Sequence, residues 1–217
     1  MPRLLPVLLL LLAGALPSLR AADGTVRLTV KDHKGAAVPD AVLTLVPLDR
    51  PVAAAPAPRP VVEIVQEDQE YIPYVTVLRA GTQVDFPNRD TIQHHLYSVS
   101  KPKRFEKPLY ASGARESVVF DQPGVVTLGC NIHDWMIAYV VVVDTPHFTK
   151  TDAAGAGVIA GLPAGRYRAE LWHPRLGKPV TQELTLAAGA DLPLPQTLTL
   201  RPDRRIRRAP DGKAGGY

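Results

Sequence analysis

Residues 122–143, QPGVVTLGCNIHDWMIAYVVVV, decide the fold that we expect for this chain. A Pro-Gly turn leads into an apolar strand that ends at Cys130, and a second, almost wholly apolar strand covers residues 137–143. The loop between them carries Cys130, His133 and Met136, spaced Cys-x2-His-x2-Met. Cys130 is the only cysteine, and Met136 is the only methionine apart from Met1. A thiolate, an imidazole and a thioether this close together suit copper better than other common biological metals.

A blue-copper centre needs a second imidazole, which must come from another part of the chain. The candidates are His94 and His95, which lie 36 and 35 residues before Cys130. A loop over residues 87–90 leads into this pair, and a strand follows it. Neighbouring residues of a strand point to opposite faces, so only one of the two histidines can face the metal. The site is therefore expected to be assembled from two loops at one end of a β-sandwich.

The segment from about residue 61 to residue 144 resembles the cupredoxins, small blue-copper electron carriers that include plastocyanin and amicyanin. Residues 80–100, AGTQVDFPNRDTIQHHLYSVS, are similar to the family's AGD-x-V-x-W-x-N…HN-V segment. Residues 122–130, QPGVVTLGC, are similar to its PG-x-Y-x-Y-x-C segment, and the Cys-x2-His-x2-Met loop matches amicyanin most closely. With its flanking segments, the chain also resembles cupredoxin-like proteins of methylamine utilisation.

The resemblance implies one type 1 copper ion, with His94, Cys130 and His133 as equatorial ligands and Met136 as the long axial ligand. His94 occupies the family's ligand position. His95 stands where the family has an asparagine that ties the two ligand loops together by hydrogen bonds. His95 is therefore expected to support the site from outside, or to be the alternative ligand.

Segments on either side of the copper module show a second β-rich pattern. Residues 26–47 and 151–174 resemble the first and second halves of a carboxypeptidase regulatory-like domain, which is a small transthyretin-like sandwich. This predicts that the copper module is inserted into the smaller sandwich, and two domains in tandem are the alternative. The expected fold class is all-β: a Greek-key cupredoxin β-sandwich plus a smaller transthyretin-like/carboxypeptidase regulatory-like β-sandwich.

The expected divisions of the chain follow from these patterns. Residues 101–109 are expected to be irregular and basic, and no amphipathic helix is expected. The segments are a signal peptide (1–22), the first half of the regulatory-like sandwich (23–50), a Pro/Ala linker (51–60), the copper domain (61–144), the second half of the regulatory-like sandwich (145–203) and a basic disordered tail (204–217).

The first residues have the order of a secretory signal: Arg3, an apolar run from Leu4 to Leu12, and then small residues. This run is too short to span a bilayer. We therefore expect an exported protein, periplasmic or secreted, without stable membrane insertion after cleavage; an uncleaved anchor is the alternative. A single cysteine excludes an internal disulfide. The net charge of +4 is modest, and the basic tail lacks interleaved aromatic residues, so nucleic-acid binding is not expected.

The sequence favours electron transfer rather than an enzymatic reaction. It contains no second cluster of copper ligands, no Gly-x-Ser-x-Gly and no Gly-rich phosphate loop. The expected partner is a redox protein, a dehydrogenase or a cytochrome, that docks near His133, where Ile132 and Trp135 would form an apolar patch. Two other functions stay open: a periplasmic copper carrier or assembly factor, and a non-redox carbohydrate- or protein-binding β-sandwich module.

Overall fold

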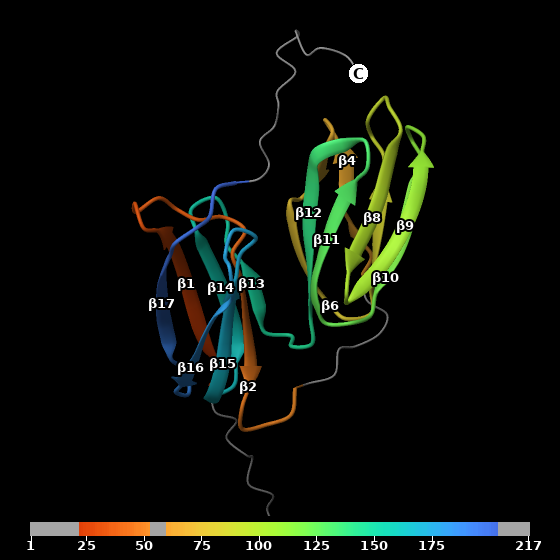
Figure 1. Ribbon diagram of the computed structural model, residues 1–217. Coiled ribbons are helices and arrows are strands. Elements are labelled where there is room, and N and C mark those ends of the chain that lie inside the picture. The colour runs from red at the N-terminus through yellow and green to blue at the C-terminus, as the bar shows by residue number, and fades with distance from the viewer. Residues whose placement is uncertain (1–21, 53–59, 204–217) are drawn as a thin grey trace, which may run out of the picture.

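The computed structural model describes residues 22–52 and 60–203. Within these ranges all of the regular secondary structure is β-strand. The strands form two β-sandwiches, seen as two separate bodies in Figure 1. The all-β prediction is therefore confirmed. No helix in the described ranges has the length and apolar character needed to cross a membrane. The predicted signal peptide (apart from Ala22), the predicted basic tail and most of the predicted Pro/Ala linker lie outside the described residues.

One sandwich is built from the two outer parts of the chain. Its sheets have the strand orders β14-β1-β17 and β13-β2-β15-β16. The strands are β1 (Gly24–Asp32), β2 (Val42–Pro47), β13 (Phe148–Lys150), β14 (Ala156–Leu162), β15 (Gly165–Trp172), β16 (Val180–Leu186) and β17 (Asp191–Leu198). The strands before residue 48 thus pair directly with strands after residue 147, and the intervening segment forms the other sandwich.

The other sandwich has sheets of order β10-β7-β3 and β6-β12-β11-β8-β9, with a separate β4-β5 hairpin. Its strands are β3 (Val62–Glu63), β4 (Val65–Glu67), β5 (Glu70–Ile72), β6 (Val75–Arg79), β7 (Thr82–Pro87), β8 (His94–Ser100), β9 (Lys103–Tyr110), β10 (Arg115–Phe120), β11 (Gly124–Cys130) and β12 (His133–Val143). The loop between β11 and β12, the start of β8 and the strand β4 all lie at the upper end of this body in Figure 1. The predicted ligands are thereby gathered at one end of the sandwich.

Alternation along β12 explains how this strand is packed. Met136, Ala138 and Val140 are buried in the core between the two sheets, whereas the residues between them are only partly covered. Residues 140–143 are buried without interruption. Only the second half of β12 is therefore buried on both faces.

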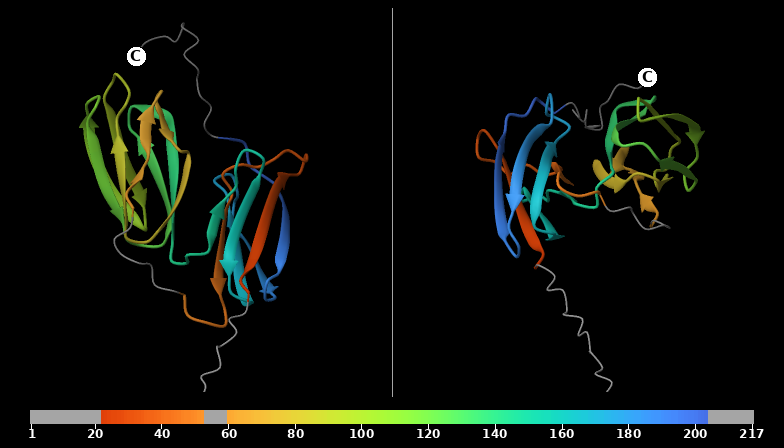
Figure 2. Two further views of the ribbon diagram at one scale, coloured as in Figure 1. Left: turned by 180° about the vertical axis from the view of Figure 1, so that it is seen from behind. Right: turned by 90° about the horizontal axis from the view of Figure 1, so that it is seen from below.

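Contact between the two sandwiches explains the burial at the end of β12. Val141 and Val143 belong to an apolar cluster that also contains Val42 of β2 and Val75 of β6. The ring of Tyr139 packs edge-on against Trp172 of β15, with 5.6 Å between the ring centroids. Figure 2 shows the two sandwiches next to each other from two further directions. An apolar contact therefore joins the sandwiches at the end of β12 away from Cys130.

The prediction of irregular structure over residues 101–109 is wrong, because residues 103–110 form β9 at an edge of the five-stranded sheet. Side chains in the first part of β9 alternate between partly buried and exposed, but half of the residues of this strand are charged, which hides the period-two pattern. Lys103 pairs with Asp121 at 3.0 Å and Lys107 with Glu116 at 2.8 Å. Charged residues on an edge strand also discourage pairing with other chains.

Candidate metal centre

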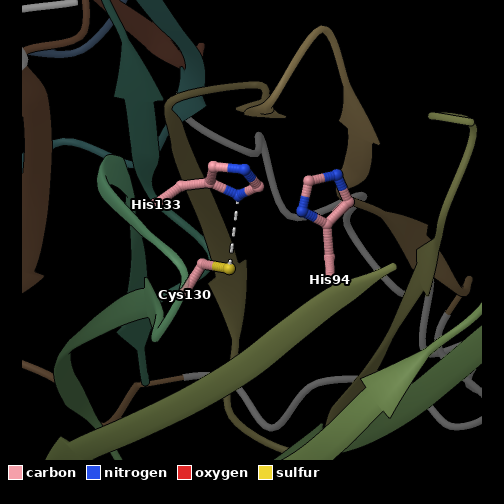
Figure 3. A group of neighbouring side chains, drawn as sticks. All are labelled: His94, Cys130 and His133. Carbon is pink, nitrogen blue, oxygen red and sulfur yellow. Dashed lines mark hydrogen bonds between the residues drawn. The ribbon is translucent and has the colours of Figure 1, made fainter. Parts of the chain in front are cut away.

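Three of the predicted ligands come together where strands of the larger sheet start or end. Cys130 is the last residue of β11, His133 is the first of β12, and His94 is the first of β8. One ligand atom from each lies within 4.8 Å of those of the other two. The Sγ atom of Cys130 is 3.7 Å from Nδ1 of His133, and the His94 and His133 rings have centroids 5.0 Å apart. Figure 3 shows the three side chains facing one another.

The hydrogen bonds of His94 indicate which of its ring nitrogens is free for a metal. Nε2 lies 2.6 Å from Oδ2 of Asp90, so it carries the proton that this hydrogen bond needs. Nδ1 then has a lone pair, and it faces Cys130 and His133 (Figure 3). This nitrogen is fully buried and makes no hydrogen bond of good geometry with the described residues. Because buried polar atoms are nearly always satisfied, a metal ion fits as the partner of His94 Nδ1.

The charges around the site favour a thiolate at Cys130. Burial raises the pKa of its thiol, whereas His94 and the backbone N–H groups of Ile132 and His95 lower it. The lowering effects are together larger, so the pKa of Cys130 lies below its ordinary value. Burial lowers the pKa of His94, yet Cys130 and Asp90 outweigh it and raise this pKa above its ordinary value. Burial and repulsion by His94 lower the pKa of His133. The thiolate is the form of cysteine that binds metals, so this electrostatic environment suits a metal centre.

His95 lies outside the cluster. Its Nε2 is 2.9 Å from a carboxylate oxygen of Glu106 on β9, and 3.4 Å from Nδ2 of Asn131 in the β11–β12 loop. The ring also packs against Tyr97, with centroids 5.6 Å apart. Strand alternation explains why only one of the two neighbouring histidines reaches Cys130, and the structure has His94 in this position. His95 instead links an edge strand to the loop that carries the other ligands.

Met136 is buried in the core, and residues flanking His133 reach the surface. Met136 is 1% exposed and belongs to the same apolar core as Cys130. Ile132 is 51% exposed, whereas His133 is partly buried. The Trp135 ring packs against His133, with centroids 5.3 Å apart. The predicted apolar patch thus has one clearly exposed member, Ile132, beside a half-buried histidine and tryptophan.

Asp90 was predicted only as part of the loop over residues 87–90, and not as a residue of the site. Its Oδ1 accepts a hydrogen bond from the backbone N–H of Asp68 at 2.7 Å, and its Oδ2 accepts one from that of Gln69 at 2.9 Å. The same Oδ2 contacts His94. A carboxylate four residues before a candidate ligand histidine was the signal that could have revealed it.

Two further residues hold the ligand-bearing strands in place. The Tyr71 hydroxyl lies 3.1 Å from the carbonyl oxygens of both His95 and Gly129, so it joins β8 to β11 beside the ligands. Gly129 leaves room for the ring of Tyr97, since a Cβ atom there would lie 2.9 Å from the Cζ atom of that ring. Neither contact was predicted, because each joins residues that are far apart in the sequence.

Several solved structures of copper proteins are similar to part of this chain. No protein-family model and no curated protein matches the chain. A purple cupredoxin from Nitrosopumilus maritimus is 26% identical and is matched over 38% of this chain and 99% of its own, with a TM-score of 0.35. Amicyanin from Paracoccus versutus is 21% identical, over 46% of this chain and 97% of its own, with a TM-score of 0.36.

A copper-containing nitrite reductase from Thermus scotoductus is 28% identical over 44% of this chain, with a TM-score of 0.38. This chain spans only 26% of that reductase. Each of the three matches thus covers less than half of this chain.

Proposed function

We propose that this chain is a type 1 copper protein that transfers single electrons. The observation that carries the proposal is the convergence of His94 Nδ1, Cys130 Sγ and His133 Nδ1, with His94 Nδ1 buried and unsatisfied. A thiolate with two imidazoles and a weak thioether is the donor set of blue-copper electron-transfer sites. Bound copper would supply a change of one electron between Cu(I) and Cu(II).

Each ligand side chain has a distinct task in this proposal. Cys130 would supply the thiolate that holds copper, and His94 and His133 would supply the two imidazoles. Met136, buried in the same core as Cys130, would supply the thioether. Because all four donors come from the protein, no position is left for a substrate, and the proposal includes no enzymatic reaction. The hydrogen bonds and packing around the ligands keep them in one arrangement for both oxidation states.

The proposed electron route leaves the site at His133. This residue is partly buried and lies next to Ile132, which is 51% exposed. An apolar rim of this kind suits a small, transient interface with a redox protein such as a dehydrogenase or cytochrome. A periplasmic location is part of the proposal and rests on the signal-like order of residues 1–22. A role in methylamine utilisation rests on the sequence resemblance alone.

Repeated reduction and oxidation of the copper-loaded protein in the presence of a copper chelator tests this function. We expect one copper per chain to be retained in both oxidation states. Copper should also raise the melting temperature, because a ligand that binds only the native state at 100 times its Kd adds about 2.7 kcal/mol of stability. The control is His33→Asn, since His33 is exposed between β1 and β2 and outside the cluster, so its loss should change neither result.

Other outcomes of the same experiment point to the two alternative functions. Retention of Cu(I) together with loss of Cu(II) to the chelator would contradict electron transfer and favour a copper carrier or assembly factor. A melting temperature that does not respond to copper would contradict a copper function altogether, and would favour a non-redox binding module.

A further inference from the structure

We propose that Asp90 is a positioning residue that orients His94 for the metal by joining it to the turn of the β4–β5 hairpin. The inference rests on the proposed function for the identity of the metal. It assigns a role to a carboxylate and to a hairpin that lie outside the ligand set itself.

The contacts of the Asp90 carboxylate are the first support. Both of its oxygens are used: Oδ1 accepts from the Asp68 N–H, and Oδ2 accepts from the Gln69 N–H and lies 2.6 Å from His94 Nε2. The side chain of Asp90 is 13% exposed and that of His94 is 0% exposed. Three donors to one largely buried carboxylate leave it little freedom to rotate, and a hydrogen bond to a charged acceptor is stronger than one between neutral groups.

The loop that carries Asp90 is also held from its other side. Asn88 is 1% exposed, and its Oδ1 accepts a hydrogen bond from the backbone N–H of Asp90 at 3.0 Å. Its Nδ2 donates to the carbonyl oxygens of Ile92 at 2.8 Å and Tyr110 at 3.1 Å. The backbone N–H of Arg89 donates to the carbonyl of Gln66 at 2.8 Å, which ties this loop to β4. Asp90 is therefore fixed before any metal is bound.

The turn of the hairpin has the backbone conformation that lets it hold a carboxylate. Asp68 and Gln69 have φ angles of 54° and 57°, and their two successive N–H groups both reach Asp90. Residues with positive φ at both central positions are typical of a tight two-residue hairpin turn. Successive N–H groups in such a turn form a small concave anion site, here occupied by the carboxylate of Asp90.

The consequence for His94 concerns the tautomer and the direction of its ring. A carboxylate at Nε2 favours the proton on that nitrogen and leaves the lone pair on Nδ1, which is the atom that faces Cys130 and His133 (Figure 3). Without Asp90, the proton would distribute between the two nitrogens and the ring could rotate. Outer partners of this kind typically change metal affinity about 10–100-fold when they are lost.

The test compares Asp90→Asn with Asp121→Asn, and each removes one carboxylate. Asp121 is a matched control because its side chain is 55% exposed and pairs with Lys103 in the same sandwich, away from the cluster. In Asp90→Asn, the side-chain NH2 group would face N–H donors. We expect copper affinity, measured by competition with a chelator, to fall about 10–100-fold in Asp90→Asn and to stay unchanged in Asp121→Asn. Equal affinity in both variants would overturn the proposal.

A second measurement uses the metal-free wild-type chain and needs no variant to fold. At alkaline pH, where the His94 ring is neutral, its nitrogen NMR shifts should show a protonated Nε2 and an unprotonated Nδ1. A proton on Nδ1 of the neutral ring would overturn the positioning role, even if the chain binds copper. Conversely, absence of copper binding by the wild type would remove the proposed function, while the tautomer measurement would still decide what Asp90 does.

A purely structural role for Asp90 makes a different prediction. If the carboxylate only fastened the hairpin, Asp90→Asn would speed amide exchange at Asp68 and Gln69 but leave the His94 tautomer and the copper affinity as in the wild type. That combination would contradict the positioning role. Faster exchange together with a mixed tautomer and weaker copper binding would support it.

Discussion

Replacing His94 by glycine is expected to remove the colour of the copper-loaded protein, and added imidazole is expected to restore it. The variant loses a full equatorial bond, because His94 Nδ1 is the buried nitrogen facing Cys130 and His133. The space left by the ring would admit free imidazole as a substitute ligand. Absorption spectra recorded with and without imidazole measure the effect, and titration against a copper chelator measures the lost affinity.

The matched control is His95→Gly, which removes the neighbouring imidazole. His95 contacts Glu106 and Asn131 and lies outside the cluster, so this variant should remain coloured, with an affinity loss of about 10–100-fold at most. Loss of colour in His95→Gly, with colour retained in His94→Gly, would mean that the ligand is His95 and that β8 presents its other face to the metal.

Phe120→Ala is expected to destabilise the sandwich that contains the His94–Cys130–His133 cluster by about 3–5 kcal/mol, which is a large part of the roughly 5–15 kcal/mol that stabilises a typical domain. Phe120 is fully buried, and its ring packs against Phe86 and Phe105 with centroids 6.5 and 6.2 Å away. Removing the ring would leave a cavity between the two sheets that the surrounding strands cannot close. Denaturant unfolding followed by circular dichroism measures the loss.

Val119→Ala is the control on the same strand, since Val119 is 44% exposed and faces outward. We expect it to change stability by less than about 0.5 kcal/mol. The two sandwiches have separate main cores, so hydrogen exchange in Phe120→Ala should increase more in the sandwich that contains Phe120 than around Leu45 or Tyr167. An effect of Phe120→Ala no larger than that of Val119→Ala would contradict the described core.

Much of the fold follows from local pattern. The apolar runs of residues 122–143 predict a strand, a turn and a second strand, and the structure has β11 and β12 there. The alternation rule also separated His94 from His95, because it depends only on the geometry of a strand. These features could be predicted because each is determined by residues close together in the sequence.

The features that were missed depend on contacts between distant residues. β9 is a strand because it pairs with β8, and its charged residues give no apolar period. β14 covers a glycine-rich stretch, and its pairing with β1 spans more than 120 residues. The contact of Tyr139 with Trp172 likewise depends on how two sandwiches meet. No local pattern contains this information.

The candidate site also combines features that the local sequence predicts with features that depend on contacts between distant residues. The spacing of Cys130, His133 and Met136 and the presence of a histidine pair were visible in the sequence. The role of Asp90 was not, because it depends on the N–H groups of Asp68 and Gln69, which reach it only when the hairpin folds beside the loop. Residues that orient a ligand are set by tertiary structure, even where the ligand itself belongs to a recognisable motif.

The absorption spectrum of the Cu(II)-loaded chain, compared with that of Cys130→Ser, tests the central claim most directly. A type 1 site at His94, Cys130 and His133 predicts an intense thiolate-to-copper band at about 600 nm in the wild type and its loss in the variant. Serine keeps the size of the side chain and removes the sulfur, so the comparison isolates the thiolate. A wild-type protein that binds Cu(II) without this band, or a band that persists in Cys130→Ser, would contradict the account.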